Sequence, residues 1–327
     1  MALDDLRYIS LYGGCSIVLR LTKKEPARYV DMWVDKFIRN PLWATLVGAL
    51  VAAMVVSFFV FVQSGEAAPH TADERTPYAS VSPLIVGGTA VPNGKYPFMA
   101  ALLDKRRAGD AFDELFCGGT LIDKDSVLTA AHCLVNPKPD KLQVVVGRTA
   151  LNKNRGQLRS VSHRFIHPRY NGNGYGYDAA ILKLSRPVKG IKPIKLATAK
   201  QNNLEKPGHI LTTAGWGVVK QRPGPFDILP FRMHEVSVPV VSDSRAKLAY
   251  QSQGLKYLPS LQVAVGKKGN GPCFGDSGGP LFDSGSRTQI GITSHGAGGC
   301  GQARYPAVYT EVNNPQIGKW ILSAAKR

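Results

Sequence analysis

The apolar residues of this chain form one long run near the N-terminus and a series of short runs after residue 85. Turn-forming residues separate the short runs, and this spacing predicts strands joined by loops in a β-sandwich or barrel. We expect strands at residues 144–146, 180–184, 209–213, 236–241 and 289–292. Helical periodicity is confined to residues 315–326, where one face carries Ile317, Trp320, Ile321 and Ala324. The pattern therefore predicts an all-β body that ends in one helix.

The long apolar run covers residues 42–62 and contains no charged residue. About 20 such residues are enough for a helix to cross a bilayer. Lys36 and Arg39 precede the run and acidic residues follow it, so the positive-inside rule predicts a cytoplasmic N-terminus and an exported body. Two interpretations fit: a retained transmembrane anchor behind a cytoplasmic segment 1–41, or a cleaved signal peptide if Met32 is the true start. Residues 63–84 are polar and contain prolines, which indicates a linker or propeptide before a body at 85–327.

The body is strongly basic, although the composition is that of an ordinary globular protein. Hydrophobic residues make up 44% and charged residues 20% of the 327 residues, which excludes a wholly disordered chain. The formal net charge is +18, and residues 1–84 hold eight basic and eight acidic residues, so the whole excess lies in the body. Such charge suits nucleic acid, an anionic surface or acidic substrates. Because no nucleic-acid-binding motif accompanies it, we expect no specific nucleic-acid partner, whereas anionic cell-surface polymers stay open.

Five cysteines restrict the covalent structure. Cys15 stands alone, and Cys117, Cys133, Cys273 and Cys300 lie in the body without the short CxxC spacing that zinc ligands use. If the body is exported, two disulfides are expected, and three pairings of the four cysteines are open. We expect neither a metal site nor a cofactor.

Three polar residues stand in settings that suit nucleophilic catalysis. Ser277 lies in the sequence GDSGGP, where glycines permit a tight turn whose backbone N–H groups can form an oxyanion hole. Serine needs a base, and His132 in LTAAHC is a candidate. Such a histidine needs a carboxylate to orient it, and Asp178 enters an apolar run where burial demands a partner. Each signal alone is modest, but together they predict a Ser-His-Asp triad.

The order of these motifs resembles that of the chymotrypsin/trypsin family of serine proteases, from residue 85 to the C-terminus. The matching blocks are IVGG at 85–88, CGGTL at 117–121, AAHC at 130–133, Asp178 with its apolar tail, GDSGGP at 275–280, SHG at 294–296 and PAVY at 306–309. The resemblance implies two six-stranded antiparallel barrels, with the catalytic residues in the cleft between them.

The resemblance also implies a role for each residue of the predicted site. Ser277 would be the nucleophile, His132 the base, and Asp178 the residue that orients it. The backbone N–H groups of Gly275 and Ser277 would form the oxyanion hole, and Ser294 would support Asp178. The disulfides implied are Cys117–Cys133 and Cys273–Cys300.

Family members are made as zymogens, and the activation site can be located by the same resemblance. Cleavage between Leu84 and Ile85 would free an α-amino group that pairs with Asp276 and orders the oxyanion hole. Leu84 is neither Arg nor Lys, so we do not expect a trypsin-like activator.

The specificity pocket implied by the resemblance includes Gly271, Ser294, Gly296 and Ala307. Trypsin-like members carry Asp at the position of Gly271, where it pairs with a basic substrate residue. Without that acid we expect an uncharged, aliphatic or medium-sized residue before the scissile bond, since a buried unpaired cation is costly. The extra methyl group of Ala307 narrows the pocket. An acidic residue from another loop is the alternative that would admit a basic substrate.

Two positions depart from the family pattern. His295 stands where the family usually has Trp, so it either shifts the neighbouring subsites and makes them pH-dependent or is an exposed residue without a role. Residues 151–162, at the family's calcium loop, are basic and contain no carboxylate, which does not support a calcium site.

We therefore expect an exported serine endopeptidase, secreted or membrane-anchored, that is monomeric and cleaves proteins or peptides through an acyl-enzyme. The alternative is a non-catalytic family member that binds anionic cell envelopes through its basic surface. The three intact triad positions favour the enzyme. If Ser277→Ala abolishes proteolysis and leaves anion binding unchanged, the two hypotheses are separated.

Overall fold

The computed structural model describes residues 8–10, 16–18, 85–107, 109–135, 139–172, 175–218, 229–302 and 304–327. It divides the chain into one unit at residues 1–78 and another at 79–327. In the first unit, the described residues form two short antiparallel strands, β1 (Tyr8–Ser10) and β2 (Ser16–Val18). The predicted apolar helix at 42–62 and the linker at 63–84 lie outside the described residues. Within the described part, no helix has the length and apolar character needed to span a membrane.

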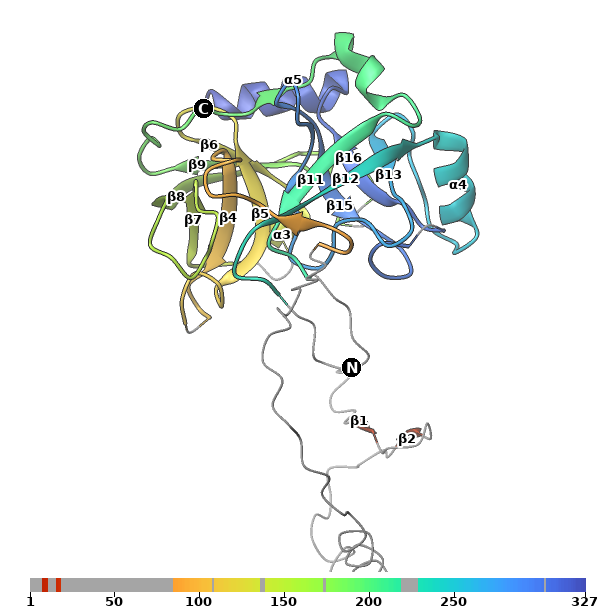
Figure 1. Cartoon of the computed structure of the whole chain (residues 1–327), viewed down its shortest axis with the longest axis horizontal. Helices are drawn as coiled ribbons and strands as arrows, with labels where there is room; N and C mark the ends of the chain where they lie inside the picture. Colours follow the sequence, from red (N-terminus) through yellow and green to blue (C-terminus); the bar gives the residue numbers. More distant parts are fainter. Residues whose placement is uncertain are drawn as a thin grey trace, which may run out of the picture. The chain divides into compact units, whose positions relative to one another are not determined.

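Six antiparallel strands close into the first barrel of the second unit (Figure 1). Their spatial order is β4-β5-β6-β9-β8-β7. The strands are β4 (Met99–Asp104), β5 (Leu115–Leu121), β6 (Ser126–Thr129), β7 (Leu142–Val146), β8 (Gln157–Ile166) and β9 (Ala180–Leu184). Most of these strands are buried, whereas β8 consists of exposed and half-buried positions, so this side of the barrel faces solvent.

The second barrel is a ring of six strands in the order β14-β11-β12-β13-β16-β15, which the pairing of β15 with β14 closes. The strands are β11 (Ile210–Gly215), β12 (His234–Val241), β13 (Gln262–Val265), β14 (Pro280–Asp283), β15 (Thr288–His295) and β16 (Ala307–Glu311). Short strands β3 (Thr89–Ala90) and β10 (Lys195–Leu196) pair with β12 and β15. One apolar cluster joins the barrels, from Leu128 and Ile181 to Ile290 and Tyr309. The two predicted six-stranded barrels are therefore confirmed.

The predicted C-terminal helix is also confirmed as α5 (Pro315–Ala325). The Asn314 side chain accepts hydrogen bonds from the backbone N–H groups of the first turn, and Pro315 suits the first helical position. The apolar face buries Ile317, Ile321 and Ala324.

A second helix, α4 (Asp243–Gln251), corrects the prediction that only the C-terminal end is helical. Ser242 caps α4 by accepting a hydrogen bond from the Arg245 N–H. The helix buries only Ala246 and Tyr250, so its apolar periodicity is too weak to stand out in the sequence. Two shorter helical segments are α3 (His132–Val135) and the 3-10 helix η1 (Ala199–Glu205).

Candidate active site

Strand pairing in the first barrel brings His132 and Asp178 together. β6 pairs with β9 so that Thr129 lies opposite Ala180. His132 begins α3 three residues after Thr129, and Asp178 stands two residues before Ala180. Residues that flank the same end of an antiparallel pair are neighbours in space, so the barrel itself positions this pair.

The Asp178 carboxylate is fully buried and accepts three hydrogen bonds. His132 Nδ1 lies 2.8 Å from Oδ2, the His132 backbone N–H donates to Oδ1 at 2.9 Å, and the Ser294 hydroxyl donates to Oδ2 at 2.6 Å. Burial raises the pKa of Asp178, but these hydrogen bonds and the interaction with His132 outweigh burial and hold the pKa below its ordinary value. Asp178 is therefore an ionised acceptor, and Nδ1 of His132 carries the proton that it donates.

The pKa of His132 is shifted upward, whereas that of Asp178 is shifted downward. Burial lowers the pKa of His132, but the hydrogen bond to Asp178 and its negative charge raise it above the ordinary value of 6.5 overall. Because Nδ1 is the donor to Asp178, Nε2 of the neutral ring is an acceptor. About a third of the side chain is exposed (30%), so the ring is accessible to a reacting group.

Ser277 lies in a tight turn before β14 that requires glycine. Gly278 has a φ of +78°, and a Cβ there would lie 2.2 Å from Thr129 Oγ1. The Gly118 N–H of β5 donates to the Ser277 carbonyl at 2.7 Å, which fixes this turn of the second barrel against the first. The described residues contain no hydrogen bond between Ser277 Oγ and His132 Nε2. Such bonds often form only when substrate binds.

The turn also presents two backbone N–H groups. Among the described residues, neither the Gly275 N–H nor the Ser277 N–H donates a hydrogen bond. The Val218 N–H donates to the Phe274 carbonyl at 2.7 Å, which holds the Phe274–Gly275 peptide in place. Gly275 has a φ of +99°, a conformation that glycine adopts readily. Two N–H groups without acceptors beside a serine are the kind of donors that an oxyanion hole needs.

Asp276, between these donors, is completely buried on the inner side of the turn. Its oxygens accept hydrogen bonds from the Gly217 N–H at 2.8 Å and the Cys273 N–H at 2.9 Å. Burial raises the pKa of Asp276 to about 6, and these two bonds offset only part of the effect. Ile85 is also fully buried and has a φ of 44°, whereas Leu84 lies outside the described residues.

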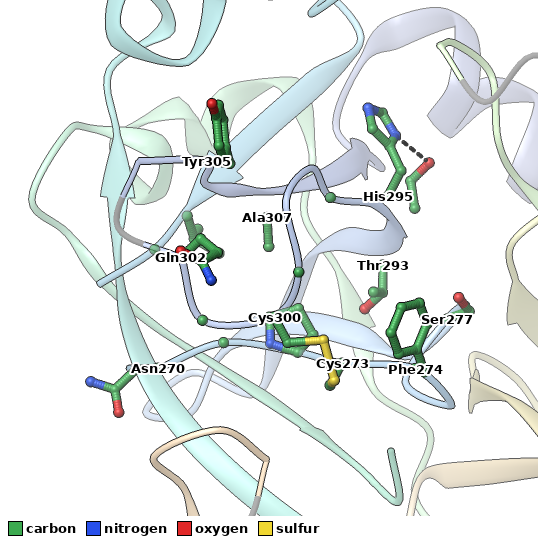
Figure 2. Close-up of a pocket in the computed structure, with 18 residues that line it drawn as sticks. Asn270, Cys273, Phe274, Ser277, Thr293, His295, Cys300, Gln302, Tyr305 and Ala307 are labelled. Atoms are coloured by element: carbon green, nitrogen blue, oxygen red, sulfur yellow. Dashed lines mark hydrogen bonds between the residues drawn. A yellow bond between two sulfur atoms is a disulfide. The ribbon is translucent and has the colours of Figure 1, made fainter. Parts of the chain in front are cut away.

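A pocket of about 290 Å³ opens beside Ser277 (Figure 2). The structure places all four predicted pocket residues in its lining: Gly271, Ser294, Gly296 and Ala307. Figure 2 shows Phe274 beside Ser277, with Gln302 and Tyr305 on the opposite side. Sequence reasoning missed these three because they come from separate segments and form no motif. The described lining residues include no Asp or Glu, so no described carboxylate supplies the alternative acidic site for a basic substrate.

His295 is half-buried at the edge of the same pocket, so it is not the exposed residue without contacts that was one of the two expectations. Its Nδ1 lies 3.1 Å from Ser294 Oγ. Since the Ser294 hydroxyl proton goes to Asp178, His295 Nδ1 is the donor in this contact. Burial lowers the pKa of His295 to about 4, which favours the neutral ring near pH 7. The rings of Tyr175 and Tyr250 lie edge-on to it.

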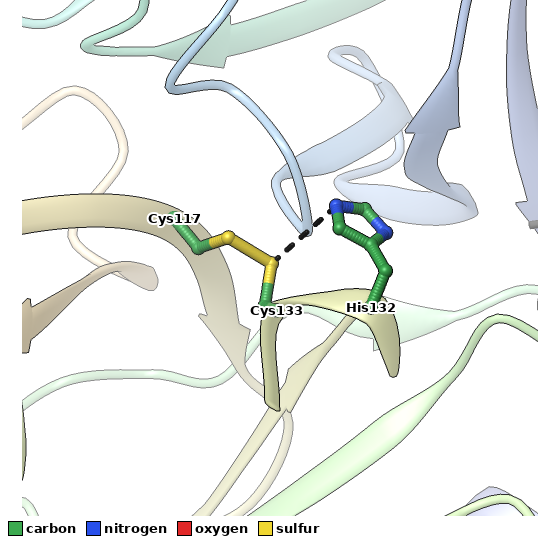
Figure 3. A group of neighbouring side chains, drawn as sticks. All are labelled: Cys117, His132 and Cys133. Carbon is green, nitrogen blue, oxygen red and sulfur yellow. Dashed lines mark hydrogen bonds between the residues drawn. A yellow bond between two sulfur atoms is a disulfide. The ribbon is translucent and has the colours of Figure 1, made fainter. Parts of the chain in front are cut away.

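Two disulfides brace the site. Cys117–Cys133 joins β5 to α3 next to His132, and Cys273–Cys300 forms part of the pocket lining. His132 Nε2 lies 3.7 Å from Cys133 Sγ, a contact marked by the dashed line in Figure 3. Cys117, His132 and Cys133 cluster closely enough to suggest metal ligands. Both sulfurs are bonded to each other, however, and a disulfide offers no thiolate to a metal ion.

Comparison with known proteins agrees with the observed fold. The family model described as Trypsin matches residues 85–321. "Trypsin" of Saccharopolyspora erythraea is 36% identical over 230 residues, which cover 70% of this chain and 93% of that protein. The "Trypsin-like protease" of Streptomyces glaucescens is 33% identical over 282 residues, 84% of this chain and 91% of that protein.

A solved structure shows the same likeness. Neuropsin, described as a serine protease expressed in the limbic system of mouse brain, superposes with a TM-score of 0.61 and 30% sequence identity, covering 73% of this chain and 98% of its own. The two six-stranded antiparallel barrels and the C-terminal helix define a chymotrypsin-like fold. The chain belongs to the trypsin family and is a serine endopeptidase.

Proposed function

We propose that this endopeptidase uses Ser277 as nucleophile, His132 as general base and Asp178 as the group that orients and stabilises His132. The observation that carries the proposal is the hydrogen-bonded series Ser294–Asp178–His132, with distances of 2.6 and 2.8 Å. It fixes the tautomer that leaves Nε2 of His132 able to accept a proton.

The reaction then proceeds in two halves. Ser277 Oγ attacks the carbonyl carbon of the scissile bond while His132 Nε2 takes the hydroxyl proton. The carbon–nitrogen bond breaks as His132 returns that proton to the leaving amine, which gives an acyl-enzyme. Water repeats the sequence, and hydrolysis of the ester frees Ser277. The N–H groups of Gly275 and Ser277 stabilise the oxyanion, and each such donor contributes about 10²–10³ in rate.

Activation by cleavage between Leu84 and Ile85 is part of the proposal. Asp276 is buried with two backbone donors, and its raised pKa indicates that it lacks charge compensation. An α-amino group freed at Ile85 would supply that compensation. Because Asp276 stands between the two proposed oxyanion donors, its ion pair would order them.

Substrate preference follows from the pocket. Gly271 and the other described lining residues offer no carboxylate for a basic side chain, and Ala307 reduces the width. We infer a preference for an uncharged aliphatic or medium-sized residue before the scissile bond, and Leu84 fits that preference. The substrates are then exported proteins or peptides, which the body reaches either as a secreted domain or from an anchor at residues 42–62.

The test is cleavage of a mixed peptide library, with the cut sites read by mass spectrometry. Wild type is expected to cut after uncharged residues, and Ser277→Ala is expected to lose at least about 10³-fold in kcat/KM. Ser323→Ala, an exposed position on α5, is the matched control and should retain full activity. Cleavage by Ser277→Ala at the wild-type rate would refute the assignment of the nucleophile, and cuts mainly after Lys or Arg would refute the pocket.

A further inference from the structure

The positive charge of the chain is concentrated in one segment, which begins in the first barrel and ends just beyond it. Residues 141–204 contain thirteen Lys and Arg but a single acidic residue, Asp178, so they hold +12 of the total +18. Asp178 is buried and engaged with His132, so it does not neutralise the surface. The segment comprises β7, β8 and β9 of the first barrel, which Figure 1 shows on the side away from the second barrel, and β10, which pairs with β15.

Almost none of this charge is compensated by ion pairs. Of the thirteen basic side chains, only Lys183 has a carboxylate within ion-pair distance among the described residues, that of Asp125 at 2.7 Å. Other parts of the domain do form such pairs, for example Lys95 with Glu235 and Arg106 with Asp104. A surface that needs charge only for solubility would mix the two signs.

Hydrogen bonds join two of the segments that carry these basic residues. The Arg159 guanidinium on β8 donates to the carbonyls of Arg186 and Pro187. Gln157 donates to the Lys189 carbonyl at 2.6 Å and accepts from the Lys189 N–H at 3.0 Å, so the loop after β9 lies against β8. We call this surface the basic face; its members are Lys153, Arg155, Arg159, Arg186, Lys189 and Lys192.

One end of the basic face is hollowed. Lys153 and Arg155 line a cavity of about 610 Å³ together with Arg232 from the second barrel, and its described lining includes no Asp or Glu. Arg232 donates to the Val91 carbonyl and the Asn93 side chain, and Arg148 donates to the Arg155 carbonyl, so the walls are held in place. Neutral oxygens fix these cations without cancelling their charge.

We propose that the basic face is a docking surface for a linear polymer of phosphate groups, separate from the catalytic residues. A surface of uncompensated Lys and Arg complements repeated phosphates, which bind ammonium groups as point charges and guanidinium groups through paired hydrogen bonds. A protein partner would need central apolar or aromatic anchors. Among the described residues, β8 exposes only Leu158 and Ile166 as large apolar side chains, and neither is aromatic.

The experiment measures binding of linear inorganic polyphosphate to the full chain with Ser277→Ala, in non-ionic detergent, over a series of salt concentrations. Binding is then measured without proteolysis. The docking proposal can therefore fail while the catalytic assignment stands, and the catalytic assignment can fail while the docking proposal stands. One variant changes four residues of the basic face to Gln, and a control changes four exposed lysines of the second barrel. The basic-face set is Lys153, Arg155, Lys189 and Lys192, and the control set is Lys247, Lys256, Lys267 and Lys268.

Both variants lose four positive charges, so only the position differs. The binding constant K falls as salt rises, and the basic-face variant is expected to make the slope of log K against log salt less steep by about 3. Each lost phosphate contact removes about 0.7 from the steepness. The control is expected to change the slope by less than about 1. Equal losses in both variants, with unchanged thermal unfolding, would overturn the proposal. So would poly-glutamate of equal charge, or vesicles of anionic lipid, that bind the basic face more tightly than polyphosphate.

Discussion

Asp276 offers a test of the activation step, because the pH dependence of folding stability can be compared between the uncleaved and the cleaved chain. Two backbone N–H groups hold its buried carboxylate, and the described residues provide no cation to pair with it. Burial raises the pKa of Asp276 from an ordinary 3.8 to about 6. This difference corresponds to about 3 kcal/mol of folding free energy.

The sign of the effect follows from linkage. A carboxyl group with a raised folded-state pKa favours folding when protonated, so its contribution is complete below about pH 4 and is lost as pH rises through about 6. The uncleaved Ser277→Ala chain is therefore expected to lose about 3 kcal/mol of stability from Asp276 between about pH 4 and pH 7. Asp276→Asn keeps an oxygen acceptor but cannot titrate, so this part of the pH dependence should disappear.

The assay is urea unfolding of the Ser277→Ala chain, with and without Asp276→Asn, at the two pH values. Other groups titrate in the same range, including Glu311, whose pKa burial raises to about 8, but they contribute equally to both chains and cancel in the difference. A third sample, cleaved before Ile85 at an inserted enteropeptidase site, should lose the Asp276 contribution because the new ammonium group pairs with the carboxylate. Identical pH dependence with and without Asp276→Asn would refute the reasoning.

Three further substitutions test the site. Ser294→Ala removes the hydroxyl that donates to Asp178 at 2.6 Å, which should cost about 1.5–3 kcal/mol of folding stability. It should also raise the pKa of His132, which would appear as an upward shift of the acid limb of the pH profile of kcat/KM. An unmoved acid limb would argue against the hydrogen-bonded series. Ala307→Gly widens the pocket and should favour Phe over Val before the scissile bond by about tenfold in kcat/KM, whereas an unchanged ratio would place the pocket elsewhere. Gly278→Ala should lower the free energy of unfolding by at least about 2 kcal/mol, because the new Cβ would clash with Thr129. Gly285→Ala is the control: a Cβ there lies 3.6 Å from its nearest atom, so the free energy of unfolding should hardly change.

The parts of the fold that the sequence predicted are those with local signals. The strand expected at 180–184 has those bounds in the structure, because a short apolar run enters the core as a unit. The C-terminal helix was predictable from the spacing of Ile317, Ile321 and Ala324. Helix α4 was missed because it buries only Ala246 and Tyr250, while its one large aliphatic residue, Leu248, is exposed.

The site shows the same division. Ser277, His132 and Asp178 stand in contiguous motifs, so the sequence alone was enough to propose them as a triad. The Ser294–Asp178 contact could be expected from the family resemblance, but the bond from His295 to Ser294 could not, since a burial-dependent tautomer leaves no mark in the sequence. The excess of positive charge was evident from composition. Its concentration along β8 and the loop after β9 depends on hydrogen bonds such as those between Gln157 and Lys189.

The most direct test of the central assignment is the intact mass of the produced chain, with and without an organophosphonate that labels activated serines. We predict a species that begins at Ile85 and carries one label, mapped to Ser277 and absent in Ser277→Ala. An unlabelled species that begins at Ile85, or a label that persists in Ser277→Ala, would contradict the proposed catalytic site.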